Sequence, residues 1–147
     1  MIPPIFHILL SAIGIAGFSL CRYLYKCKHE KQPLICPMRG NCDFVTTSKY
    51  SKFLGIHLEI IGMIYYGLVA VVHASMLLFP MLAGTNETML GLAASSCAFV
   101  FSIYLTGIQA FVLRQWCTWC LTSAALCALI FFTTYFSDPS IFPFKFF

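Results

Sequence analysis

Charged residues are scarce in this sequence, and their scarcity indicates the class of protein. Only 10% of the 147 residues are Asp, Glu, Lys or Arg, 60% are hydrophobic, and the mean hydropathy is +0.86. A soluble domain of this size has too little interior to hide so much apolar surface. The composition therefore excludes a soluble protein and indicates one integral membrane domain over residues 1–147.

Two further features are missing, and each absence removes an explanation. Residues 1–25 have no basic segment before the apolar run and no small-residue cleavage site. We therefore expect a retained membrane span in place of a cleaved signal peptide. The eight cysteines lie in an apolar chain, which fits neither a small secreted disulfide scaffold nor a soluble zinc module.

Four long apolar stretches are present, at about 5–25, 58–79, 89–113 and 117–136. About 20 apolar residues cross the hydrocarbon core of a bilayer as an α-helix. The first two stretches are separated by a polar loop, 26–56, which carries six basic residues. We predict an all-α membrane protein, a four-transmembrane-helix bundle with this cysteine-bearing loop as a cap at one end.

Counting the spans brings two cysteine pairs to one membrane surface. The loop carries Cys36 and Cys42, and the fourth stretch begins with Cys117-Thr-Trp-Cys120. The second span leaves the loop side and the third returns to it, so the fourth span starts on that side. We therefore expect two dithiols that are far apart in the sequence to meet.

A Cys-x-x-Cys pair at a helix N-terminus favours a redox role. Unpaired N–H groups, the helix dipole and the nearby Arg114 would stabilise a thiolate, which is the form that attacks a disulfide. Two pairs in series could pass electrons from a partner protein to a membrane-soluble quinone. Two other interpretations stay open: cysteines that only pack in the core, and a structural zinc site made from all four.

The residues around both pairs resemble the vitamin K epoxide reductase family. The resemblance covers about residues 36–127 and rests on Cys36-Pro-Met-Arg-Gly-Asn-Cys42, Ser48, Gly55-Ile56, Ile61-Gly62 and the membrane pair. The five-residue gap between the loop cysteines is similar to that of the prokaryotic homologues, and the inserted half-helix of the vertebrate enzymes is lacking. Many prokaryotic homologues carry a fused thioredoxin-like domain. None is expected here, which implies a separate thioredoxin-like or DsbA-like thiol protein as partner.

The resemblance implies a role for each matching residue. Cys36 exchanges disulfides with the partner, and Cys42 carries electrons inward through a transient disulfide with Cys117. Cys120 faces the quinone and forms an adduct or charge-transfer complex with it, while Ser48 assists electron transfer or supports the loop. The implied substrate is ubiquinone, menaquinone or vitamin K, and no metal is required.

Aromatic side chains near the cysteine pairs are candidates for the quinone site. Four of them, Phe44, Tyr50, Phe53 and Trp116, could cover a quinone ring from the loop side, or they could equally anchor the loop among lipid head groups. Vertebrate members place an asparagine and a tyrosine in this region. This chain has Leu58 and Ala124 at those positions, so the corresponding contacts are in doubt.

Small and ionisable residues inside the spans have simpler interpretations. His57 and Glu59 stand at the start of the second span, where an ionisable residue can be functional. We expect instead that solvent surrounds both at the membrane surface. Gly14 and Gly17 are expected to mark close packing between helices.

The basic residues disagree with the orientation that the family implies. Eight of the nine Lys and Arg residues fall on or near the loop side and only Lys145 falls on the other, so the positive-inside rule places the cysteines in the cytosol. A relay that generates disulfides needs an oxidising compartment. We therefore expect the bacterial inner membrane with the loop facing the periplasm, or alternatively the membrane of the endoplasmic reticulum with the loop facing its lumen.

The predicted function is a quinone-dependent thiol–disulfide oxidoreductase that supports disulfide bond formation. Reduction of vitamin K epoxide uses the same cysteines and is the alternative within the enzyme class. A non-enzymatic membrane protein, with a cap held by a four-cysteine zinc site or by disulfides, is the alternative of another class.

Overall fold

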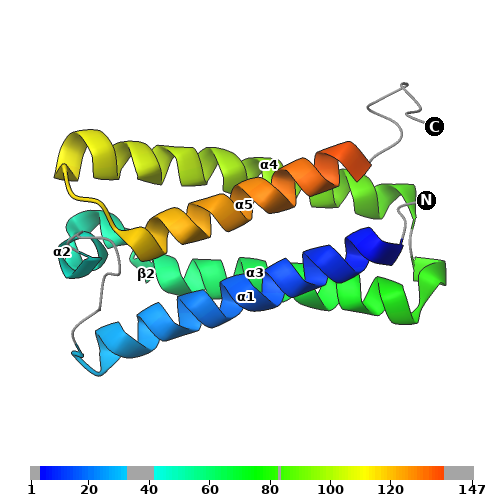
Figure 1. Ribbon diagram of the computed structural model, residues 1–147, viewed down its shortest axis with the longest axis horizontal. Helices are drawn as coiled ribbons and strands as arrows, with labels where there is room; N and C mark the ends of the chain where they lie inside the picture. Colours follow the sequence, from blue (N-terminus) through cyan, green and yellow to red (C-terminus); the bar gives the residue numbers. More distant parts are fainter. Residues whose placement is uncertain (1–3, 33–41, 83, 138–147) are drawn as a thin grey trace.

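The described part of the chain forms a bundle of long helices (Figure 1). The computed structural model describes residues 4–32, 42–82 and 84–137. The long helices are α1 (Pro4–His29), α3 (Leu58–Leu78), α4 (Thr85–Gly107) and α5 (Thr118–Ser137). Within the described residues, four helical segments are long and apolar enough to cross a membrane, and they expose many large apolar side chains. The predicted four-transmembrane-helix bundle is confirmed.

Glycines let α1 and α3 approach each other closely. A Cβ atom at Gly14 would lie 2.8 Å from the backbone nitrogen of Ala70, and one at Gly17 would overlap the ring of Tyr66. The predicted role of both glycines in close helix packing is confirmed. The α4 helix packs on α5, and the two pairs of helices meet where α1 contacts α5.

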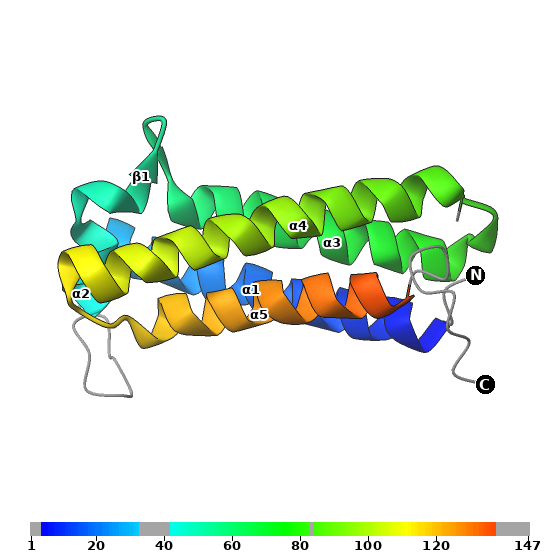
Figure 2. The same cartoon turned by 90° about the horizontal axis from the view of Figure 1, so that it is seen from above.

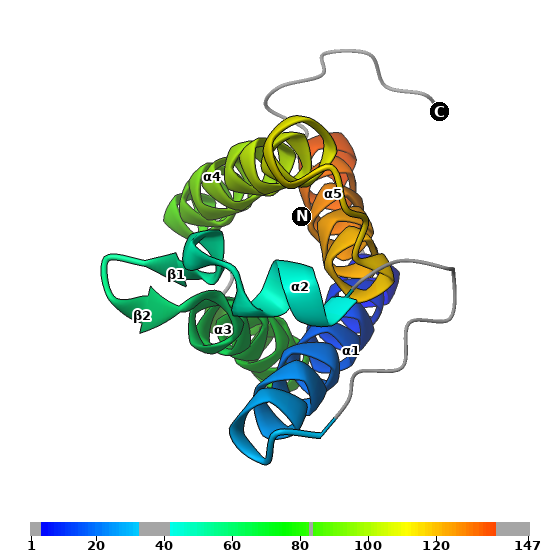
Figure 3. The ribbon, with the colours of Figure 1, turned by 90° about the vertical axis from the view of Figure 1, so that its left-hand side faces the viewer.

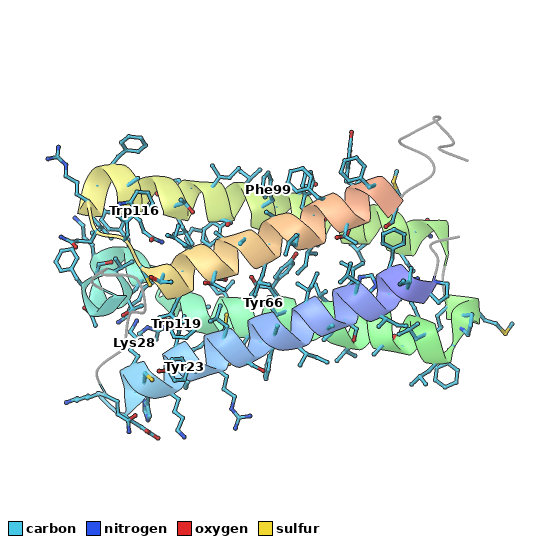
Figure 4. All side chains as sticks on the ribbon, viewed as in Figure 1. Tyr23, Lys28, Tyr66, Phe99, Trp116 and Trp119 are labelled. Atoms are coloured by element: carbon cyan, nitrogen blue, oxygen red, sulfur yellow. The ribbon has the colours of Figure 1, made fainter. Side chains whose placement is uncertain are left out.

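Tyr66 joins the helices at the centre of the bundle. Its side chain is only 1% exposed, and its hydroxyl donates to the carbonyl oxygen of Ser123 at 2.8 Å and lies 3.1 Å from Cys127 Sγ. Figure 4 shows Tyr66 in the middle of the bundle, between α1 and α5. These contacts link α3 to α5, and Gly17 on α1 provides the space for the ring.

The loop between α1 and α3 contains short elements that the sequence analysis did not predict. They are α2 (Cys42–Thr47), the 3₁₀-helix η1 (Lys49–Ser51), β1 (Lys52–Phe53) and β2 (Ile56–His57). The two strands pair antiparallel across a two-residue turn in which Leu54 and Gly55 have φ of 53° and 82°, as a type I′ turn requires. Figure 2 shows the hairpin projecting beside the bundle, and Figure 3 shows α2 lying across the end of the bundle.

Several helix ends differ from the predicted bounds. The first helix continues past residue 25 to His29, because lysine is a good helix former and tolerates the polar boundary. It ends where Lys31 takes a left-handed φ of 54° and the Gln32 N–H donates to the Cys27 carbonyl, an arrangement typical of helix C-termini. The third helix starts earlier than the predicted residue 89, since a 3₁₀-helix, η2 (Pro80–Leu82), is followed by α4 at Thr85.

The third span changes its helical pitch before it ends. Residues Ile108–Leu113 form a π-helix, η3, and Arg114 then takes a left-handed φ of 52° that stops it. Residues 114–117 connect η3 to α5 at the same end of the bundle as α2 (Figure 1). This places the start of α5 beside the loop, as the span count predicted.

Candidate functional site

Cys117 forms the N-terminal cap of α5. Its carbonyl oxygen accepts a hydrogen bond from the Leu121 N–H, and its Sγ atom accepts one from the Cys120 N–H at 3.3 Å. A side chain that accepts from the third residue of a helix is the usual N-cap arrangement, with sulfur here in place of oxygen. The Cys-x-x-Cys spacing therefore places one sulfur at the helix N-terminus and the other one turn inside.

The hydrogen bonds around Cys117 lower its pKa. The largest contribution is a hydrogen bond with the Cys120 thiol, with further contributions from the backbone N–H groups of Cys120 and Trp119. Burial and the negative charge of Glu59 act in the opposite direction. Arg114, which was expected to help, is an exposed residue at the bend before Cys117.

Gln109 ties η3 to the cysteine pair. Its side-chain Oε1 accepts from the Cys117 N–H at 3.2 Å, and its backbone carbonyl accepts from the N–H groups of Arg114 and Gln115. The residue is only 5% exposed. A π-helical turn is often found at functional sites, and here it holds the connection between two spans in a fixed geometry.

The loop packs directly on the cysteine pair. Cys117 is fully buried in an apolar cluster with Leu24 and Cys27 of α1 and Val45 of α2, and Cys120 packs against this cluster. Beside it, the rings of Tyr23 and Trp119 lie 5.3 Å apart. Figure 4 shows these two rings at the loop end of the bundle. Cys117 is thus enclosed by groups from α1 and α2, on the side from which a loop thiol would approach.

Cys120 faces a large apolar cavity that Cys117 does not line. The cavity has a volume of about 520 Å³ and lies among α3, α4 and α5, with η1 and α2 at the loop end. Most of its lining side chains are apolar; among them are Ile61, Phe101, Leu105 and Leu113. The two sulfurs of the pair therefore have different surroundings, one buried against the loop and one on the cavity wall.

One residue of an ion pair, Glu59, lies on the wall of this cavity. Lys28 Nζ lies 3.5 Å from Glu59 Oε1 and donates to Ser51 Oγ at 3.2 Å, so that it joins α1, η1 and the first turn of α3. Glu59 is only 6% exposed and lines the cavity. The expectation that solvent surrounds Glu59 was wrong, because the longer α1 brings Lys28 over it and the cap covers both. His57 is partly buried.

The structure brings some of the predicted quinone-site residues to the cavity. Tyr50, Leu58 and Ser48 line it, and so does Ala124. The Ser48 hydroxyl donates to the Val45 carbonyl oxygen at 2.8 Å. This hydrogen bond supports the end of α2, and the predicted part of Ser48 in electron transfer stays a prediction.

Two of the four aromatic candidates lie elsewhere. Phe44 is 48% exposed and Trp116 is 50% exposed, and neither is among the residues that line the cavity. Both are at the loop end of the bundle, where the alternative role, anchoring the loop at the membrane surface, would place them. The prediction that they cover the quinone ring gains no support from their positions.

The loop cysteines lie at or beyond the edge of the described residues. Cys36 falls outside them, and for Cys42 only the backbone, at the start of α2, is described. The six cysteines whose side chains are described are free thiols. Among the described residues no group of three or more potential ligands could hold a metal. The proposed four-cysteine zinc site also needs the side chains of Cys36 and Cys42, which lie outside the described residues, so that hypothesis stays untested.

Comparison with known families agrees with the geometry. The model of the vitamin K epoxide reductase family matches residues 6–135 of the 147-residue chain. The chain belongs to the vitamin K epoxide reductase family. It is therefore a multi-pass membrane protein and an oxidoreductase of a family that works with quinones or vitamin K.

Three residues of the site were not recognised from the sequence. Gln109 and Tyr65 both line the cavity and stand within apolar spans, where nothing in the local pattern distinguishes them from packing residues. Lys28 was assigned to the polar loop. Gln109 is a polar residue inside a membrane span, and this signal could have identified it. The partner of Lys28, Glu59, lies 31 residues away in the sequence, so their contact could be recognised only from the fold.

Proposed function

We propose that this protein oxidises the thiols of a thioredoxin-like partner and reduces a membrane quinone, and that it thereby supports disulfide bond formation. The observation that carries the proposal is the division of the Cys117–Cys120 pair between two environments. Cys120 lines the apolar cavity, while Cys117 is buried beside the loop. A dithiol in this position has one sulfur for the quinone and one for an incoming thiol.

The last step of the proposed reaction balances without a metal. The two thiols of Cys117 and Cys120 give two electrons and two protons to a quinone. The products are a Cys117–Cys120 disulfide and a hydroquinone, whose two oxygens carry the protons. The lowered pKa of Cys117, which comes first from its hydrogen bond with the Cys120 thiol, favours the thiolate that starts thiol–disulfide chemistry.

The cavity suits the head group of a quinone. Its volume of about 520 Å³ is within the range of roughly 300–1,000 Å³ that ligand pockets occupy. Its mainly apolar lining favours a ligand that partitions into the bilayer. The helices on either side expose apolar side chains, which suits a ligand that arrives from the bilayer.

The loop pair completes the proposed relay. The thiols of the partner reduce a Cys36–Cys42 disulfide by exchange. A Cys42 thiolate then attacks Cys117 in the membrane disulfide, and resolution of the mixed disulfide leaves the membrane pair reduced. The contact between Val45, three residues after Cys42, and the cluster around Cys117 supports this order.

The experiment is quinone reduction by the purified protein, driven by a dithiol reductant. Ubiquinone, menaquinone and vitamin K are each tested, together with vitamin K epoxide. We expect reduction of at least one quinone by the wild type, and its loss in Cys117→Ala and in Cys120→Ala. Cys97→Ala is the matched control, because Cys97 also lines the cavity but has no partner thiol at Cys-x-x-Cys spacing.

The outcomes separate the candidate functions. Reduction of the epoxide in preference to every quinone would favour a role in the vitamin K cycle. A wild type that reduces none of these compounds and retains stoichiometric zinc would rule out the proposed function and leave a structural cap. Trapping a Cys42–Cys117 disulfide in the Cys120→Ala variant then tests the order of the relay.

A further inference from the structure

Two residues on the cavity wall each have a buried polar atom without a hydrogen-bond partner among the described residues. Among the described residues, the buried side-chain nitrogen and oxygen atoms without a hydrogen bond are His57 Nδ1, Glu59 Oε2 and Tyr65 Oη. Glu59 and Tyr65 both line the cavity. A buried polar atom without a partner costs about 1–3 kcal/mol, so these two atoms point to a ligand that supplies the missing hydrogen bonds.

Three other polar side chains on the cavity wall already form hydrogen bonds. The Tyr66 hydroxyl donates to Ser123, the Ser48 hydroxyl donates to Val45, and the side-chain oxygen of Gln109 accepts from Cys117. A quinone in the cavity would therefore meet Glu59 and Tyr65 as the buried groups with unused hydrogen-bonding capacity.

The two groups have complementary chemistry. Glu59 forms an ion pair with Lys28 through one carboxylate oxygen, at 3.5 Å. Its other oxygen, Oε2, can then only accept a hydrogen bond. The Tyr65 hydroxyl can donate one. A quinone carbonyl oxygen only accepts, whereas a hydroquinone hydroxyl also donates.

We propose that Tyr65 and Glu59 bind the two oxygens of the substrate ring and distinguish its redox states. Tyr65 donates to a carbonyl oxygen of the quinone, and Glu59 Oε2 accepts from a hydroxyl of the hydroquinone. The residues are six positions apart on α3, about 9 Å along the helix axis, so they reach opposite edges of one ring. Both are specificity-determining contacts, and this inference rests on the proposed quinone chemistry.

Binding by Glu59 stabilises the reduced state of the ligand. The two electrons and two protons still come from the Cys117 and Cys120 thiols, and Glu59 and Tyr65 end the reaction in the state in which they began. Because the carboxylate repels the lone pairs of a quinone carbonyl and accepts from a hydroquinone hydroxyl, it favours the product over the substrate in the site.

The test compares Tyr65→Phe and Glu59→Gln with the wild type in steady-state quinone reduction, with the hydroquinone added as product inhibitor. Tyr65→Phe is expected to raise KM for the quinone roughly tenfold. Glu59→Gln is expected to weaken hydroquinone inhibition roughly tenfold without raising KM for the quinone. Tyr104→Phe and Glu87→Gln are matched controls at exposed positions and should match the wild type.

A second readout separates this inference from the proposed function. The rate at which dithiothreitol reduces the Cys117–Cys120 disulfide, measured without quinone, should stay within about twofold of wild type in Tyr65→Phe. Glu59→Gln removes a negative charge that acts on Cys117, and it should retain this reduction. If Glu59→Gln does not fold because Lys28 is left buried, the double variant with Lys28→Met replaces it and should show the same weakened inhibition.

The inference is overturned if the wild type reduces the quinone while both variants keep wild-type KM and product inhibition, since water would then satisfy the two atoms. It is also overturned if the variants lose reduction by dithiothreitol in parallel, since their role would be structural. If the wild type and the two control variants all fail to reduce any quinone, the proposed function itself is wrong.

Discussion

At the scale of single residues, Cys117 combines burial with a lowered pKa. Burial alone opposes ionisation of a thiol, yet the hydrogen bonds from Cys120 and from the helix N-terminus prevail. The thiolate is held by groups of its own helix. Its stability therefore depends on Cys120 even before the two sulfurs exchange electrons.

Replacing Cys120 should change the titration of Cys117. In Cys120→Ala the largest cause of the lowered pKa is lost, so the pKa of Cys117 should rise and the thiolate should appear only at higher pH. Cys120→Ser keeps a hydroxyl donor and should give a smaller rise. The measurement is the ultraviolet absorbance of the thiolate against pH, with Cys117→Ser in each background as blank; equal midpoints in the two variants would contradict the explanation.

Gln109 should affect electron transfer without affecting quinone affinity. Gln109→Leu leaves the buried Cys117 N–H without an acceptor, at a cost of about 1–3 kcal/mol, and should lower kcat roughly tenfold. Gln109→Glu retains an acceptor oxygen and should stay closer to wild type. Gln115→Leu, at an exposed position of the same connection, serves as control, and an unchanged kcat in Gln109→Leu would show that this hydrogen bond is dispensable.

At the scale of elements, the contact between α1 and α3 holds the cavity wall in place. Tyr66 packs over Gly17, and α3 carries Glu59 and Tyr65 into the cavity. A shift of α3 against α1 would also stretch the ion pair between Lys28 and Glu59. The close approach of these two helices thus determines the geometry of the cavity as well as the stability of the bundle.

Gly14→Ala should destabilise the protein, whereas Gly67→Ala should not. The new Cβ would lie 2.8 Å from the backbone of Ala70, so the helices must separate, at a cost of about 1–3 kcal/mol. In Gly67→Ala the nearest atom is in the Phe18 ring at 3.6 Å, an ordinary contact. Thermal unfolding in detergent measures both, and equal midpoints would show that the helices adjust without loss.

At the scale of the whole molecule, the orientation in the membrane is a prediction. The chemistry of disulfide formation requires the loop end to face an oxidising compartment, while eight of nine basic residues lie on or near that end. The chemistry and the charge distribution thus point to opposite orientations. We expect the loop end outside the cytosol.

Paired cysteine substitutions test the orientation. The first substitution is Lys52→Cys, on the exposed hairpin at the loop end. The second is Met81→Cys, in η2 at the opposite end, where Met81 is fully exposed. In right-side-out membrane vesicles, with Cys36 and Cys42 changed to serine, a membrane-impermeant maleimide should label the first and not the second. The reverse pattern would place the redox site in the cytosol.

The length and spacing of the apolar runs were enough to predict the four spans and the position of the membrane cysteine pair. The number of spans also fixed the end of the bundle at which Cys117 lies. The ends of the helices were less predictable, because α1 stops at the left-handed Lys31 and not where hydropathy falls. Glu59 was misjudged because its burial depends on Lys28 and Ser51, which reach it only after the loop has folded back.

The π-helix before the cysteine pair has a consequence for the length of the chain in this region. A π-helical turn contains one residue more than the α-helical turn that it replaces, so η3 corresponds to a single-residue insertion in the third span. Removing one residue, such as Ala110, would let the segment return to α-helical pitch and would turn the following residues by about 100°. Gln109 would then no longer face the Cys117 N–H. Length in this segment is therefore under a stricter constraint than composition, and a deletion here should be less tolerated than most substitutions.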